Sequence, residues 1–379
     1  MINLKNQNLK LGVLLFGVVL LSSACSISTS STGGSSSANS TEKDASVFLS
    51  TDRGDNWRIM TNLANAGGKI ETINDINVNL MTMDPQDSMA IYLASYNSGL
   101  YYTYNIANGW NKVKSLEAGT VNDVKIDPKN KCIIYAAVTN RLYRSNDCAR
   151  NWKQVYYDNN TTVSVNTVAI DHFDTNIIYI GTSRGEIIKS LDSGESWQTI
   201  QRLEEGVARL IISPLDSRLI FVATSRNRIF SFSPISSKDS AIPFSPDGGN
   251  LVDKWTDLNN VLADYNLGSS FKDFIICSQD GTMFIATDKL ILRSPDNGIT
   301  WESIKLIQPE KDAVINAMNV NPRNSNEIYY VTNTTFFRSS DGGLTWTTKK
   351  LPTKRAGREL LVDFTNPTII YMGTVILKK

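Results

Sequence analysis

One eight-residue pattern, Ser-x-Asp-x-Gly-x-x-Trp, returns along this chain of 379 residues and limits what the chain can fold into. The copies follow one another at roughly 45 residues, the length of a four-stranded β-repeat. An active site needs one copy, so several copies indicate architecture. The five clear copies are Ser50, Asp52, Gly54 and Trp57; Ser145, Asp147 and Trp152, with Ala149 in place of Gly; Ser190, Asp192, Gly194 and Trp197; Ser294, Asp296, Gly298 and Trp301; and Ser339, Asp341, Gly343 and Trp346.

All seven Trp residues belong to this repeat. An eroded copy runs from Thr103 to Trp110, and Trp255 closes a seventh unit that begins near Ser231 and contains an insertion. Upstream of each copy lie an apolar strand, a turn rich in Asp, Asn and Pro, and a second apolar strand with one aromatic residue. These aromatic residues are Tyr92, Tyr135, Tyr179, Phe221, Phe284, Tyr329 and Tyr371.

Each unit therefore supplies four antiparallel strands, and the sequence predicts an all-β, seven-bladed β-propeller. The chain begins with a copy of the pattern and ends with a strand pair, so we expect N- and C-terminal half-blades to join and close the ring. Closure removes exposed sheet edges. The last residues, VILKK, compete with Val47–Ser50 for one strand position, and the sequence leaves that competition open.

The spacing of the pattern fits a hairpin turn between the third and fourth strands. The Asp carboxylate can accept backbone N–H bonds, Gly supplies a positive φ, and the Ser hydroxyl adds a local bond. The Trp side chain is expected to bury its apolar surface between neighbouring blades. These residues are therefore predicted to be structural.

With these copies, the span from about Ala45 to Lys379 resembles the seven-bladed Asp-box, or BNR, propellers. Families similar to it include photosystem II stability and assembly factors, sortilin ectodomains and xyloglucanases. In these families the box lies away from the functional face, so the resemblance implies the fold and names no activity.

The residues of the enzymatic relatives do not carry over. Sialidases have an early Arg-Ile-Pro, and both Arg58-Ile59 and Arg228-Ile229 lack the proline. Xyloglucanase-like enzymes place two catalytic acids in a cleft between two propellers, and this chain has the repeats of one. We expect no catalytic residue. A glycan-binding protein or glycoside hydrolase stays the alternative, because two of 37 acidic residues could meet at the required separation.

The N-terminus predicts export. Residues 1–24 read as a signal peptide, with Lys5 and Lys10 before an apolar run that is too short to span a bilayer permanently. The sequence LSSAC resembles a lipoprotein lipobox, which implies lipidation of Cys25; secretion after another cleavage is the alternative. Residues 25–45 are rich in Ser and Thr and read as a disordered tether, with the propeller over 46–379.

Composition excludes several classes of function. The chain has 38 basic and 37 acidic side chains, so charge alone attracts neither nucleic acid nor an anionic membrane. The sequence implies no metal and no cofactor, because His172 is the one histidine and no nucleotide-binding pattern occurs. We expect a monomer.

Two cysteines and one set of basic residues stand out in the sequence. Cys132 and Cys148 lie symmetrically about Asn140 and are hypothesised to form a disulfide, which leaves Cys277 unpaired and buried. The turns between second and third strands lie opposite the boxes and carry a candidate binding arc of Arg141, Arg184, Arg226 (or Arg228) and Lys289. Such an arc would engage an acidic protein segment or acidic glycan. The leading prediction is a non-catalytic scaffold of the cell envelope that binds a protein partner.

Overall fold

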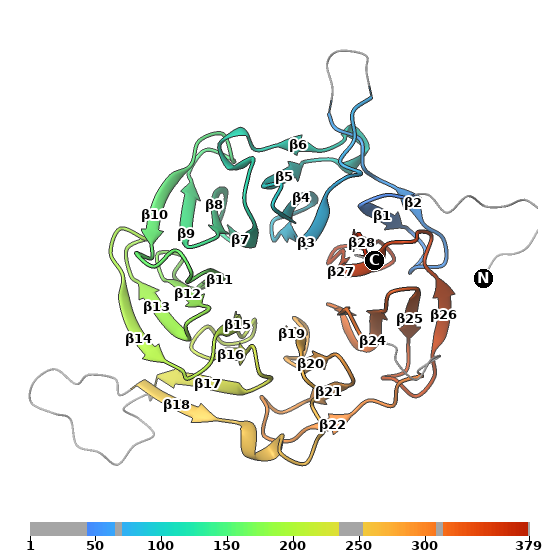
Figure 1. Ribbon diagram of the computed structural model, residues 1–379. Coiled ribbons are helices and arrows are strands. Elements are labelled where there is room, and N and C mark those ends of the chain that lie inside the picture. The colour runs from blue at the N-terminus through green and yellow to red at the C-terminus, as the bar shows by residue number, and fades with distance from the viewer. Residues whose placement is uncertain (1–43, 65–69, 235–252, 308–313, 378–379) are drawn as a thin grey trace, which may run out of the picture. The chain divides into compact units, whose positions relative to one another are not determined.

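The strands of the chain pair in groups of four, as the repeat predicts. The protein is described by a computed structural model that covers residues 44–64, 70–234, 253–307 and 314–377. These residues form seven antiparallel four-stranded sheets arranged around a ring (Figure 1). The predicted all-β, seven-bladed propeller is thereby confirmed. The predicted signal peptide, Cys25 and almost all of the tether lie outside the described residues.

Six blades are continuous in sequence and run from the inner to the outer strand. The first three consist of β3 (Asn77–Asp84), β4 (Asp87–Tyr96), β5 (Leu100–Thr103) and β6 (Asn111–Lys112); β7 (Val121–Asp127), β8 (Asn130–Val138), β9 (Arg141–Ser145) and β10 (Lys153–Tyr157); and β11 (Val165–Ile170), β12 (Ile178–Thr182), β13 (Glu186–Ser190) and β14 (Gln198–Arg202). The next three consist of β15 (Val207–Ile212), β16 (Ile220–Thr224), β17 (Ile229–Pro234) and β18 (Asp253–Asp257); β19 (Phe271–Ile276), β20 (Met283–Thr287), β21 (Ile291–Ser294) and β22 (Glu302–Ser303); and β23 (Ala317–Asn321), β24 (Asn324–Val331), β25 (Thr335–Ser339) and β26 (Thr347–Lys350).

The seventh blade joins the two ends of the described chain. From the channel outward it consists of β27 (Ala356–Val362), β28 (Ile370–Val375), β1 (Val47–Ser50) and β2 (Arg58–Ile59). The strands β28 and β1 pair across the join, with a register that runs from Val47↔Gly373 to Ser50↔Ile370. The ring therefore closes by half-blades, as expected. Val375 ends β28 and the Ile376 N–H donates to Asn77 Oδ1 at 2.7 Å, so the tail turns to the next blade and leaves β1 its place.

The apolar core is distributed between the blades. Seven clusters of buried side chains occur in the described residues, and each combines side chains from two neighbouring blades. The seven aromatic residues of the inner hairpins are all buried. Second strands such as β12 (IYIGT) are buried throughout, whereas outer strands such as β26 (TTKK) are exposed, which matches their composition. The core thus forms a ring of seams around a central channel.

The alternation of strand direction defines two faces. The first-to-second-strand turns and the Ser-Asp-Gly-Trp turns lie on one face, here the box face, because both follow strands that run the same way. The second-to-third-strand turns and the blade-to-blade connections lie on the opposite face. The helices of the described residues are the 3-10 turns η1 (Ile106–Asn108), η2 (Lys114–Leu116) and η3 (Asn259–Val261), and none has the length or apolarity to cross a membrane.

Candidate functional site: a two-mouthed central channel

The Ser-Asp-Gly-Trp turns are closed hydrogen-bond units. Ser190 Oγ accepts from the Gly194 N–H at 2.8 Å and donates to Asp192 Oδ1 at 2.8 Å. Asp192 then accepts the Ser196 N–H at 2.8 Å and the Ser196 hydroxyl at 2.5 Å. Gly194 has φ +95°, a conformation that favours glycine. The four other clear copies form the same bonds.

Sequence reasoning missed the residue before each Trp, which closes the turn on the Asp carboxylate. It is a side-chain donor in every copy: Asn56, Asn151, Ser196, Thr300 and Thr345. These hydrogen bonds lower the pKa of the box aspartates, to about 2 in Asp52, Asp192 and Asp341. The carboxylates are thus held by their own turn.

The indoles lie against the preceding blade. Trp197 Nε1 donates to Val155 O at 2.8 Å, Trp346 Nε1 to Lys305 O at 2.9 Å, and Trp110 Nε1 to Met60 O at 2.8 Å. The eroded copy therefore keeps the packing role of its Trp. Trp57 packs edge-on against Phe336, at 5.4 Å between ring centroids. These contacts join blades.

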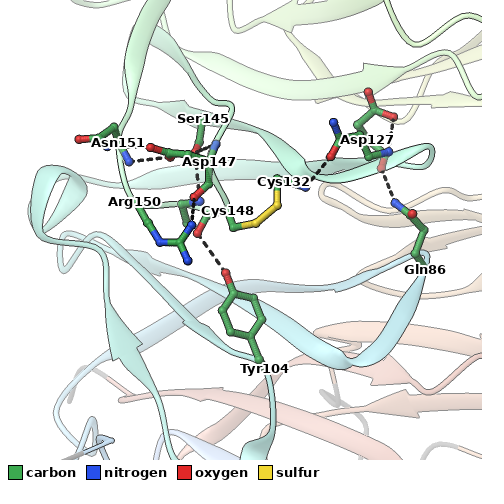
Figure 2. Close-up of a disulfide and its surroundings, with 11 residues drawn as sticks. Gln86, Tyr104, Asp127, Cys132, Ser145, Asp147, Cys148, Arg150 and Asn151 are labelled. Carbon is green, nitrogen blue, oxygen red and sulfur yellow. Dashed lines mark hydrogen bonds between the residues drawn. A yellow bond between two sulfur atoms is a disulfide. The ribbon is translucent and has the colours of Figure 1, made fainter.

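Figure 2 shows a disulfide between Cys132 and Cys148 beside one of these turns. The hairpin register pairs Ile134 with Ser145, one residue away from symmetry about Asn140. Because β9 ends at Ser145, Cys148 belongs to the turn, and its N–H donates to Cys132 O at 3.1 Å. Cys277 is buried and unpaired, and burial raises the pKa of its thiol.

The channel is lined by the innermost strands, and in six blades a β-bulge near the start of this strand turns one side chain toward it. The bulge residues are Asn79, Asn122, Asn166, Ala208, Lys272 and Arg358. The three asparagines donate to the carbonyls of Val121, Val165 and Val207 of the next blade at 2.8–2.9 Å. They are clamps between blades.

At the opposite face the channel opens into a polar cavity of about 280 Å³ that contains these asparagines, Lys272 and Arg358. Arg358 Nη2 donates to Tyr96 Oη at 2.9 Å, and burial and the nearby Arg358 lower the pKa of Lys272. Neither cation forms an ion pair with a described residue. The mouth on the opposite face therefore presents two adjacent cations, and the Glu359 carboxylate lines the same cavity.

Charged side chains occupy the narrow middle of the channel. Arg209 pairs with Asp273 at 2.9 Å, and Lys125 pairs with Asp123 at 3.2 Å. Glu359 lies at the same level; burial and then the Asp273 carboxylate raise its pKa to about 8. Arg209 and Glu359 line the cavities on both sides, so this layer separates the two mouths.

At the box face the channel widens into a cavity of about 630 Å³ with an aliphatic wall that includes Ile170, Ile211, Ile275 and Leu361. His172 stands at its edge. In the described part of the chain, no three His, Cys, Asp or Glu side chains are placed to hold a metal ion.

The predicted binding arc lies on the opposite face, but its charges differ in availability. Arg184 contacts Asp158 at 3.0 Å and Glu186 at 2.7 Å, so its charge is compensated. The alternative member Arg228 pairs with Asp257 at 2.9 Å. The exposed side chains are Arg141, Arg226 and Lys289, and Arg141 lies over the Tyr157 ring. The arc is therefore interrupted. The sequence did not predict the basic pair of the channel mouth, Lys272 and Arg358. Aligning the bulge positions of the inner strands would have revealed that pair.

The fold and its channel define a seven-bladed propeller with a cavity at each mouth. No protein-family model and no curated protein matches the sequence. Similar solved structures include a Niastella koreensis GH74 enzyme (17% identity, 83% of this chain and 53% of that chain, TM-score 0.58) and the Xanthomonas campestris GH74 xyloglucanase (13%, 84% and 52%, 0.60). This chain spans about half the length of both enzymes. Another is YCF48 bound to a D1 peptide (16%, 80% and 94%, 0.57).

Proposed function

We propose that this protein is a non-catalytic binding scaffold that recognises an acidic segment of a protein partner at the opposite-face mouth of its channel. The observation that carries the proposal is the pair Lys272 and Arg358, which form no ion pair with a described residue and stand beside a row of amide side chains. A carboxylate of the partner would pair with these cations, and the Arg fork can bind it with two hydrogen bonds. YCF48, of similar fold, is known bound to a peptide.

The rigidity of the ring supports this role. Apolar seams hold the strands that carry both cations, and the Tyr96 hydroxyl accepts from Arg358, before any partner arrives, so little ordering is needed on binding. The exposed Arg141 and Arg226 would extend the contact along the same face and attract acidic segments at low salt.

A peptide array tests the proposal. Acidic peptides and matched Asn/Gln peptides would be compared on the full-length protein, with Lys272→Ala/Arg358→Ala as the variant and the exposed box-face Lys131→Ala as the control. We expect acidic peptides to bind to the wild-type protein. The double variant should bind them at least tenfold more weakly, and added salt should also weaken the binding to the wild-type protein. Equal binding of the Asn/Gln set, or an unaffected double variant, contradicts the proposal.

Glycoside hydrolysis is the second candidate, because Asp273 and Glu359 share the middle of the channel and two structural neighbours are GH74 enzymes. A raised pKa is what a general acid requires. Two observations disfavour glycoside hydrolysis. Asp273 forms an ion pair with Arg209, and a polysaccharide would have to pass through the channel to reach these acids. A panel of chromogenic glycosides and xyloglucan decides: hydrolysis that disappears in Glu359→Gln would establish the enzyme, and a glycan array would reveal binding without hydrolysis.

We further propose that the scaffold is exported and anchored to the membrane through a lipidated Cys25, which places its partner in the cell envelope. Fatty-acid labelling of the wild-type protein that is lost in Cys25→Ser supports the anchor. Labelling that persists in this variant contradicts it.

A further inference from the structure

The disulfide occupies a position that recurs around the ring. In four blades the residue after the box Asp donates its N–H to a carbonyl of the inner hairpin of the same blade, at 2.8–3.1 Å; these residues are Arg53, Cys148, Ser193 and Gly342. Ser193 adds a side-chain bond, because its hydroxyl donates to Asn176 Oδ1 at 2.9 Å. Cys148 forms a covalent bond to Cys132 at the same place (Figure 2). This box turn is therefore tied to its hairpin more firmly than the others.

Ala149 is the residue by which this turn departs from the repeat. The four glycines of the other clear copies have φ between +85° and +95°, and Ala149 has φ +66° in their place. A side chain with a Cβ disfavours this left-handed conformation by about a factor of ten. Ala149 nevertheless keeps the bond of its N–H to Ser145 Oγ, at 3.0 Å. Something other than glycine must hold the backbone here.

The same turn joins two blades. Tyr104, which follows β5 of the preceding blade, donates its hydroxyl to Cys148 O at 3.0 Å (Figure 2). The Ala149 methyl is buried in the apolar cluster between these two blades, and Trp152 Nε1 donates to Ala149 O at 3.2 Å. A movement of residues 148 and 149 would therefore disturb the seam between the blades as well as the turn.

We propose that the Cys132–Cys148 disulfide is a redox latch. It holds Ala149 in the conformation that glycine adopts in the other copies, and its reduction frees this turn from the preceding blade while the ring stays closed. A dithiol reductant breaks the S–S bond, leaves one thiol on each cysteine and itself becomes a disulfide. Both cysteines are partly exposed on the box face. The latch is separate from the acidic-segment site of the opposite mouth.

Hydrogen exchange of the full-length protein, followed by mass spectrometry before and after reduction with dithiothreitol, tests the latch. We expect exchange in the turn from Ser145 to Trp152 to rise roughly tenfold on reduction, because Ala149 can then leave the left-handed conformation. The turn from Ser190 to Trp197 has Gly194 and no disulfide, so its exchange should stay within about twofold. Cys132→Ser/Cys148→Ser should exchange like the reduced wild-type protein without any reductant.

Ala149→Gly should limit the effect of reduction to about threefold or less, since glycine adopts a positive φ without a steric cost. The matched control is Ala107→Gly, at the same offset in the eroded copy, where the residue lies in η1 and is exposed. This control should leave the effect of reduction unchanged. Unaltered exchange on reduction, an equal rise in the turn from Ser190 to Trp197, or an equal effect of reduction in the wild-type protein and in Ala149→Gly would each overturn the proposal.

Discussion

Replacing Ser190 by Ala isolates the central bond of one Ser-Asp-Gly-Trp turn. Ser190 is 1% exposed, and its Oγ accepts the Gly194 N–H at 2.8 Å inside the turn. The same hydroxyl donates to Asp192 at 2.8 Å. The alanine variant removes this acceptor without creating space for water, so it leaves a buried backbone donor unpaired. Such a donor costs about 1–3 kcal/mol of stability.

The same turn supplies the control. Ser196 donates to the other oxygen of Asp192 at 2.5 Å, but it is exposed, and water can replace it. Ser196→Ala should therefore change the free energy of unfolding by no more than about 0.5 kcal/mol. Urea titrations followed by tryptophan fluorescence measure the free energy of unfolding of both variants. An unchanged m value indicates that the substitution changed only the stability. If both variants lose the same stability, the turn is not held by its buried serine and the reasoning fails.

Three further perturbations test other parts of the ring. Replacing Cys132 and Cys148 together by Ser should lower the free energy of unfolding by about 3 kcal/mol, because the bridge closes a loop of 16 residues; equal urea midpoints for the variant and wild type would contradict this. Box aspartates such as Asp192 have a folded pKa of about 2, below the unfolded value of about 3.9, so their stabilisation is complete above that value and is lost as the pH falls from about 4 toward 2. Asp192→Asn should weaken this loss in an acid titration followed by circular dichroism, and superimposable profiles would refute it. Phe48→Ala empties a buried position of the closing strand and should cost about 3–5 kcal/mol, whereas Phe173→Ala, 78% exposed, should leave thermal unfolding almost unchanged.

The architecture was predictable because its signals are local and repeated. A turn that needs Ser, Asp and Gly at fixed offsets, followed by an indole that must reach the preceding blade, leaves the same letters in each unit. Ring closure followed from where the units begin and end, and the pairing of Val47 with Gly373 bears it out. The copy from Thr103 to Trp110 shows how far the letters can drift while Trp110 stays fully buried.

The channel was not predictable in the same way, because it depends on how seven strands face one another. Alternation along a strand assigns Lys272 and Asp273 to opposite faces, yet the bulge between Phe271 and Asp273 shifts that alternation. Ion pairs between blades are equally invisible in sequence: Arg209 and Asp273 stand 64 residues apart and meet at 2.9 Å. The predicted arc relied on aligned turns, which give position without showing that Arg184 is already paired.

The two mouths differ because the blades do not all carry the same residues at two adjacent positions of the inner strand, the bulge residue and the residue that follows it. Where the bulge residue is Asn, as in Asn79, Asn122 and Asn166, its amide donates a hydrogen bond to a carbonyl of the next blade. Where it is Lys272 or Arg358, the same geometry directs a cation to the channel instead, and the following residue, Asp273 or Glu359, sets a carboxylate in the middle layer. A closed ring with a continuous set of blade seams can lose some clamps without opening. The blades that carry Lys272 and Arg358 at these positions are therefore the ones that form the acidic-segment site proposed at the opposite-face mouth.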